Sequence, residues 1–216
     1  LDEAIAKLKG PALAEMATIL PYSVKNLHLR DAFYAGRVTN DDPLAHYERA
    51  LLSVLNALPP ANAYHEIGGG VGAVAITLGL MGHNAVNIEA AASRLEHGRN
   101  ILAALARNEP ALAERVKMVC ASAPAVFSQL DTNGAVAITT NIASSVEWDY
   151  VAGFLRSVQE NYAAYIFDLC LLWGVFRTPE AWEGHLERIA SLWGRQPELL
   201  FERGGPARYY IVRFDN

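Results

Sequence analysis

The chain has 216 residues, of which 52% are hydrophobic and 19% are charged, so it is long enough for one well-buried domain, with or without a small appendage. Its formal charge of -5 argues against a surface that neutralises phosphates, because nonspecific nucleic-acid binding depends on clustered Lys and Arg. The longest nearly apolar stretch, residues 165–176, contains Asp168 and is shorter than the roughly 20 residues that cross a bilayer. No basic-then-apolar signal segment opens the chain. We therefore expect a cytoplasmic protein with a small-molecule substrate and with neither nucleic acid nor a membrane as partner, while a homodimer stays open.

Residues 1–58 are predicted to form an N-terminal helical cap. Apolar residues at near-helical spacing indicate one or two helices over residues 1–20, interrupted at Gly10-Pro11. Residues 21–43 show no sustained period but are rich in aromatic residues, which predicts a long loop of the kind that serves as a lid. Asp42-Pro43 is typical of a helix start with the acid as N-cap, and an apolar stripe continues to Leu58.

Strands and helices alternate strictly after residue 59. Strands are predicted at 63–67, 85–89, 116–120, 134–140 and 163–170, and helices at 71–81, 92–108, 123–130, 147–161 and 179–193. This order implies a parallel sheet with helices on both faces. The runs 199–203 and 207–214 are joined by a link too short for a crossover, so they must form an antiparallel hairpin. The prediction for residues 59–216 is an α/β, Rossmann-like domain whose seven-stranded sheet has six parallel strands and one antiparallel strand.

A glycine-rich turn, EIGGGVG, follows the first predicted strand. Glycine permits positive φ and removes the Cβ atoms that would hold a ligand away, while the helix after the turn presents unpaired N–H groups. The chain is therefore expected to bind a nucleotide-like ligand at these glycines: Gly68, Gly69, Gly70 and Gly72.

The residues around the turn narrow the choice of ligand. Glu89 stands where the ribose-binding acid of a dinucleotide site belongs, so the glycine pattern alone leaves NAD(P) open. Glu66, directly before the turn, favours a ligand with a cationic amino group over one with a pyrophosphate. No lysine follows Lys117, so the Tyr-x-x-x-Lys pair of short-chain dehydrogenases is absent, and no Gly-Lys-Ser/Thr follows the glycines, which excludes a P-loop.

Over roughly residues 61–214 the chain resembles the class I S-adenosylmethionine-dependent methyltransferases. The resemblance rests on the EIGGGVG turn, on the acid that ends the second strand in VNIEA, and on the order of the seven strands. The resemblance implies S-adenosylmethionine as cofactor, with the turn at its methionine part, Glu66 near its amino group and Glu89 accepting both ribose hydroxyls. Residues after the third and fourth strands would complete the cofactor site: Ala121, Ser122, Thr140 and Asn141. An acid or small polar residue normally stands beside the adenine after the third strand. Here only Ser122 is available, and a helix N-cap is its alternative role.

The fourth strand is followed by TTNIASSVEW and not by the Asn/Asp-Pro-Pro-aromatic motif of amino methyltransferases that act on DNA bases or protein glutamine. This run and the EIGGG turn are loosely similar to bacterial sugar O-methyltransferases, which implies a hydroxyl acceptor on a small molecule. A hydroxyl acceptor needs a general base, and the candidates are Asp168, Glu147 and His185, or His28 and His46 of the cap. Each of these residues also has a purely structural alternative. The cap is expected to line the acceptor side through Tyr22, Tyr34 and His46.

Other functions stay open from the sequence: a small-molecule N-methyltransferase, an NAD(P)-dependent oxidoreductase, or a noncatalytic binding protein on the same fold. No His, Asp or Glu cluster has metal-ligand spacing, so no metal is expected.

Overall fold

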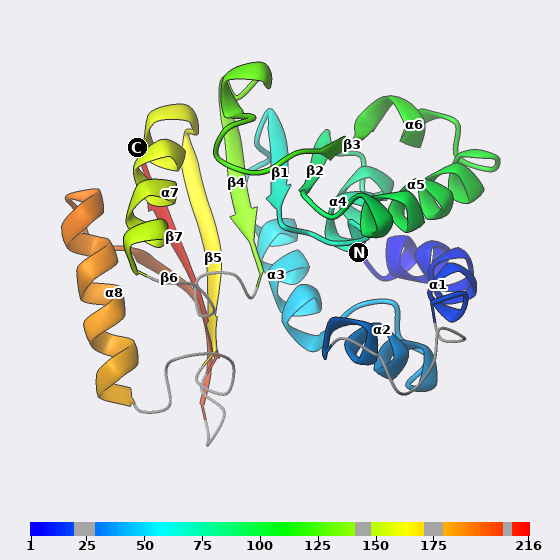
Figure 1. Cartoon of the computed structure of the whole chain (residues 1–216), viewed down its shortest axis with the longest axis horizontal. Coiled ribbons are helices and arrows are strands. Elements are labelled where there is room, and N and C mark those ends of the chain that lie inside the picture. Colours follow the sequence, from blue (N-terminus) through cyan, green and yellow to red (C-terminus); the bar gives the residue numbers. More distant parts are fainter. Residues whose placement is uncertain (20–28, 141–147, 171–178, 205–208) are drawn as a thin grey trace.

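Seven strands form one sheet in the order β3-β2-β1-β4-β5-β7-β6 in a computed structural model, which describes residues 1–19, 29–140, 148–170, 179–204 and 209–216 (Figure 1). The strands are β1 (Ala63–Ile67), β2 (Ala85–Glu89), β3 (Val116–Cys120), β4 (Ala135–Thr139), β5 (Ala164–Cys170), β6 (Glu198–Arg203) and β7 (Tyr209–Asp215). Strands β1 to β5 pair in parallel, and β7 is antiparallel to both β5 and β6. The predicted fold class, with one reversed strand in seven, is confirmed.

Helices cover both faces of this sheet (Figure 1). One face, here called the α4 face, carries α1 (Asp2–Ala17), α2 (Leu29–Thr39), α3 (His46–Ala57), α4 (Ala73–Leu80), α5 (Ala92–Ala106) and the short α6 (Ala111–Arg115). The other, the α7 face, carries α7 (Trp148–Asn161), α8 (Pro179–Trp193) and a 3-10 turn at Phe127–Gln129. Because side chains alternate along a strand, the two faces have separate cores.

The core of the α4 face joins the N-terminal helices to the sheet. Leu8 of α1 and Leu51 of α3 are fully buried in the same cluster as Val74 and Ile76 of α4. Helices α1 to α3 therefore share one continuous core with the strands and α4. The division of the chain into a cap at residues 1–58 and a domain at residues 59–216 stays a prediction.

The expected interruption of the first helix is wrong, because α1 is continuous and contains Pro11. A proline inside a helix removes one backbone hydrogen bond and crowds the preceding turn. Leu8, Ala12 and Met16, all 0% exposed, hold this helix against its neighbours instead. Burial of these side chains outweighs the local preference for a break.

The structure also corrects the predicted loop over residues 21–43, part of which lies outside the described residues. Residues 29–39 form α2. Its buried positions include Tyr34 and Arg37, and an arginine at a buried position conceals the apolar period. The predicted N-cap is wrong as well, since α3 begins at His46 with Ala45 as N-cap, while Asp42 accepts hydrogen bonds from Leu44 N–H and the Arg49 side chain.

A helix predicted at residues 123–130 is absent. Only a 3-10 turn forms there, with Phe127 N–H bonded to the Pro124 carbonyl and Gln129 N–H to the Val126 carbonyl. Ser122, which is exposed, therefore precedes no α-helix that it could cap.

Candidate active site

The glycine turn connects the carboxyl end of β1 to the N-terminus of α4. Gly68, Gly70 and Gly72 have φ values of 71°, 61° and 73°, in the left-handed region that favours glycine. Gly68 N–H donates to the Ile88 carbonyl at 2.7 Å, which ties the turn to β2. Gly69 is required for space, because a Cβ there would lie 2.3 Å from Glu66 Cδ. The predicted glycines thus form a close-packed turn at the carboxyl edge of the sheet.

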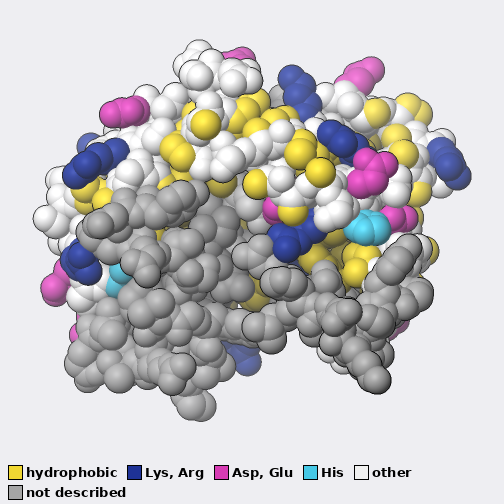
Figure 2. Space-filling model, viewed as in Figure 1, with side chains coloured by type: hydrophobic (Ala, Val, Ile, Leu, Met, Phe, Trp, Pro, Cys, Tyr) yellow, Lys and Arg dark blue, Asp and Glu magenta, His cyan; other side chains and the backbone are white. Residues whose placement is uncertain are grey.

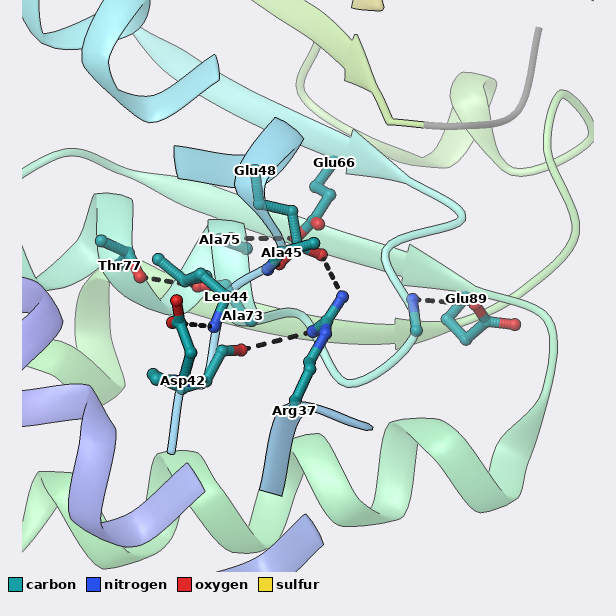
Figure 3. A network of polar contacts seen from close by, with 12 residues as sticks. Arg37, Asp42, Leu44, Ala45, Glu48, Glu66, Ala73, Ala75, Thr77 and Glu89 are labelled. Carbon is teal, nitrogen blue, oxygen red and sulfur yellow. Dashed lines mark hydrogen bonds and ion pairs between the residues drawn. The ribbon is translucent and has the colours of Figure 1, made fainter. Parts of the chain in front are cut away.

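Glu66 lies beneath this turn on the α4 face and is 1% exposed. Its Oε2 accepts a hydrogen bond from Ala75 N–H at 2.9 Å, so the carboxyl caps the first turn of α4 (Figure 3). Its Oε1 has no hydrogen-bond partner. Burial raises the pKa of Glu66 to about 8, against the opposing effect of the Ala75 hydrogen bond.

Glu89 ends β2 and binds the opposite side of the turn. Its Oε2 accepts from Gly70 N–H at 2.9 Å, and its Oε1 accepts from Ala91 N–H at 2.8 Å. Arg94 Nη1 lies 3.8 Å from Oε1. The carboxylate is 6% exposed, and each oxygen, with one backbone donor, retains acceptor capacity. Such an acid can accept further hydroxyl donors without rearrangement.

The N-terminal helices reach the turn through a buried ion pair. Arg37 of α2 donates from Nη2 to Glu48 Oε1 of α3 at 2.8 Å, and Figure 3 shows this pair beside Glu66. Arg37 Cζ lies 5.2 Å from the ring centroid of Tyr34. The Tyr34 hydroxyl would lie 2.1 Å from a Cβ on Gly70, so this side chain rests directly on the turn. Burial raises the pKa of Tyr34.

Asp168, one of the predicted bases, lies in β5 near the carboxyl end of the strand. It is 3% exposed on the α4 face of β5, one residue past the last pair between β4 and β5, which is Thr139 with Phe167. Tyr47 of α3 lies close to it: burial and the charges of Glu48 and Asp168 raise the pKa of Tyr47. The structure therefore brings together a residue of the cap and a predicted base that are far apart in the sequence.

The remaining predicted residues are placed as follows. His185 is buried on α8, beside Ile189 and Ala190 of the α7-face core, and so lies on the opposite side of the sheet from the turn. His46 is exposed and stacks edge-on with Tyr47, with 5.4 Å between the ring centroids.

Two of the predicted cofactor residues lie at strand ends. Ala121 N–H donates to the Glu89 carbonyl at 3.2 Å, which keeps the end of β3 beside Glu89, and Thr140 directly follows β4. Other predicted residues lie outside the described residues: Glu147, Asn141, Tyr22 and His28.

Three polar residues of the site were missed by the sequence prediction. Asn87 is 0% exposed on β2 and donates from Nδ2 to the Gly70 carbonyl at 3.1 Å. Its signal was a single amide inside the apolar strand AVNIE, which is unusual unless the amide has a partner. Arg37 and Glu48 gave no such signal, because charged residues on a helix are ordinarily solvated.

The described residues hold no cluster of three or more His, Cys, Asp or Glu side chains that could bind a metal ion. Within the same part of the chain, every helix is too short or too polar to cross a membrane.

Solved structures with a similar fold include several methyltransferases. The methyltransferase domain of bacterial CtHen1-C aligns with a TM-score of 0.59 and 14% identity, over 78% of this chain and 96% of that one. The C-terminal domain of precorrin-6Y C5,15-methyltransferase from Rhodobacter capsulatus aligns with a TM-score of 0.53 and 19% identity, over 79% and 88%. The chain has the class I S-adenosylmethionine-dependent methyltransferase fold. A third similar structure, the N-terminal domain of EvdMO1 with SAH bound, has a TM-score of 0.50 and 13% identity, over 78% and 79%. No family model and no curated protein matches this chain.

Proposed function

We propose that the chain is an S-adenosylmethionine-dependent methyltransferase that methylates a small-molecule acceptor, preferably at a hydroxyl. The observation that carries the proposal is the glycine turn held between two buried acids, Glu66 and Glu89, at the carboxyl edge of β1 and β2. The names of similar structures support it, since they include methyltransferases and one domain with SAH bound.

The residues at the turn suit this cofactor. Glu89 has acceptor capacity for the two ribose hydroxyls, and its carboxylate is already oriented by Gly70 N–H and Ala91 N–H. Gly68 has no Cβ atom, so the methionine part could lie directly on the backbone at this position. The cap places Tyr34 over the same turn, where an aromatic ring favours a cation.

A dinucleotide fits the same turn poorly. Pyrophosphate sites use the free N–H groups at a helix N-terminus. Here Ala75 N–H already donates to Glu66, and Gly70 N–H already donates to Glu89. A pyrophosphate would meet two acids where it needs donors, so NAD(P) is the weaker alternative.

Asp168 is the residue that we assign to the acceptor side. Bound S-adenosylmethionine supplies a methyl group on a sulfonium, which is transferred by in-line displacement. The chain must therefore position the acceptor, exclude water and, for a hydroxyl, remove a proton. Asp168 lies past the end of β4 on the same face as Glu66, with Tyr47 of the cap nearby, so its carboxylate could take that proton. An amine acceptor would need no such base.

The distribution of surface charge supports a small-molecule acceptor. Among the described residues on the face shown in Figure 2, charged side chains of both signs are interspersed, and the Lys and Arg side chains do not gather into a large patch of the kind that binds phosphates. The formal charge of -5 is consistent with this distribution and with a small-molecule acceptor.

Thermal unfolding in the presence of candidate ligands tests the proposal first. We expect S-adenosylmethionine and S-adenosylhomocysteine to raise the melting temperature and NAD(P) to leave it unchanged. Stabilisation by the dinucleotide alone would overturn the proposal.

Transfer of a labelled methyl group to a panel of alcohols and amines then tests the reaction. With an alcohol acceptor, Asp168→Asn should lower kcat by roughly 100-fold to 10,000-fold while donor affinity stays unchanged. With an amine acceptor the same variant should retain its rate, which would favour N-methylation. Donor binding without transfer to any acceptor would favour a noncatalytic protein.

A further inference from the structure

Two buried acceptor atoms beneath the glycine turn have no hydrogen-bond partner: Glu66 Oε1 and Asn87 Oδ1. The two side chains are 1% and 0% exposed. Both side chains lie against the same backbone position, because a Cβ on Gly69 would lie 2.3 Å from Glu66 Cδ and 2.6 Å from Asn87 Oδ1. Buried acceptors without a donor are rare in proteins and unfavourable.

The other atoms of both groups are fixed, so rotation does not supply the missing donor. Glu66 Oε2 accepts from Ala75 N–H, and Asn87 Nδ2 donates to the Gly70 carbonyl. Turning the Asn87 amide over would place its oxygen against that carbonyl oxygen. A single proton on Glu66 Oε1 would give both orphaned atoms a partner, since the carboxyl would then donate to Asn87 Oδ1.

The charged groups around Glu66 have opposing effects. Burial is the largest and favours the neutral carboxyl, and the charges of Glu48 on α3 and Glu89 on β2 act in the same direction. Arg37 on α2 and the hydrogen bond from Ala75 N–H favour the charged form. A positive charge added above the turn would move this balance toward the carboxylate.

Resting on the proposed function, we propose that Glu66 carries a proton in the ligand-free protein, donates it to Asn87 Oδ1, and releases it to solvent when the cationic methyl donor binds. The O–H bond of the carboxyl breaks on donor binding and forms again once methyl transfer has removed the sulfonium charge. Glu66 is therefore a specificity-determining residue, which distinguishes donor from product by charge and makes donor affinity depend on pH.

Glu66→Gln is the variant that separates this role from a structural one. Its amide can accept from Ala75 N–H and donate to Asn87 Oδ1, as the protonated carboxyl does, but it has no proton to release. Glu96→Gln is the control, because it removes one exposed carboxylate of α5 while leaving Glu66, Asn87 and Glu89 in place.

Calorimetry of S-adenosylmethionine binding at pH 6.5, in two buffers of different ionisation enthalpy, counts the protons released. At this pH the amino group of the ligand stays protonated, with a typical pKa of about 7.7–8.0. We expect release of up to one proton by the wild type and by Glu96→Gln, and none by Glu66→Gln. As pH is raised toward 8, the affinity of the wild type for S-adenosylmethionine should increase by up to about tenfold per pH unit, in addition to any change seen in Glu66→Gln. Equal proton release by the wild type and Glu66→Gln would overturn the inference and leave the proposed function standing.

Stability of the ligand-free protein provides a test that needs no cofactor. A carboxyl whose folded pKa is raised from 4.5 to about 8 keeps its proton in the folded state after the unfolded chain has lost it. Stability should therefore fall as pH rises from about 4.5 to 8, and this component should be absent in Glu66→Gln. Identical pH dependence in the two proteins would contradict a protonated Glu66. Absence of any binding heat from S-adenosylmethionine would instead refute the proposed function, and donor-driven release with it.

Discussion

The two faces of the central sheet bury different kinds of side chain. The α4 face combines an aliphatic core with buried acids at the sheet's carboxyl edge, Glu66, Glu89 and Asp168. The α7 face buries an aromatic cluster, in which Tyr165 stacks on Phe167 at 4.7 Å and Trp193 lies 5.0 Å from Phe214. Both faces are built on the same strands, and the alternation of side chains assigns each residue to one or the other.

We infer from this difference that the α4 face carries the ligand-binding groups and that the α7 face contributes to stability alone. Buried charges are unfavourable unless they are paired or used, and on the α4 face they surround the glycine turn and the end of β5. The aromatic face offers its buried rings dispersion and apolar contact. We therefore expect changes on the α7 face to affect folding alone, and changes on the α4 face to affect both folding and ligand binding.

The largest effect should follow from Phe167→Ala on the α7 face. Phe167 is 0% exposed and lies between Tyr165 and Phe214, so the truncation leaves a cavity and lowers the free energy of unfolding by about 4 kcal/mol. Urea unfolding measures this loss. The affinity of the folded fraction for S-adenosylmethionine should stay unchanged, and a tenfold weaker affinity would show that the faces are not separable.

On the α4 face, Glu48→Ala should lower the free energy of unfolding by about 3 kcal/mol, because it leaves Arg37 buried without its carboxylate. It should also weaken donor binding, since Arg37 supports Tyr34 on the turn. The double variant Arg37→Met with Glu48→Leu is the control and should recover most of the stability but not the binding. If binding recovered as well, the ion pair would be a purely structural element.

Buried groups on the two faces should make stability depend on pH in opposite senses: Glu66 on the α4 face lowers stability as pH rises, and His65 on the α7 face lowers it as pH falls. His65 on the α7 face is 2% exposed with Nδ1 3.0 Å from the Tyr162 hydroxyl, and burial lowers its pKa from 6.5 to about 4. The folded state therefore resists a proton that the unfolded chain accepts, so stability is lost as pH falls from 6.5 toward 4. Between pH 6.5 and 5 the loss should be about 2 kcal/mol in the wild type and absent in His65→Gln. Equal losses in urea unfolding would mean that His65 titrates normally.

Much of the fold was predictable from sequence. Short apolar runs bounded by Gly, Pro and polar residues located β1, β2 and β3 to the residue, and the short link after β6 required the reversed strand. The helix at residues 123–130 failed because local apolar spacing cannot distinguish one α-helical turn from a 3-10 turn. Helix α2 was missed for another reason, since its buried Arg37 is acceptable only with Glu48 of α3, a partner that local patterns do not reveal.

The candidate site also contains some residues that the sequence predicted and others that it did not. Glu66, the glycines and Glu89 lie within one βαβ unit, so their convergence followed from chain order. Asn87 lies in the same unit, whereas Tyr34 reaches the turn through tertiary packing, and the proximity of Tyr47 to Asp168 depends on how α3 lies over the sheet. His185 was a candidate base by residue type alone, and the position of α8 places it on the other face.

The most direct test of a methyl-donor site between the two acids is calorimetry of S-adenosylmethionine binding to the wild type and to Glu89→Ala. Removing the carboxylate deletes the proposed acceptor for the ribose hydroxyls and frees Gly70 N–H and Ala91 N–H, so the dissociation constant should rise about tenfold or more. An unchanged dissociation constant would contradict the assignment.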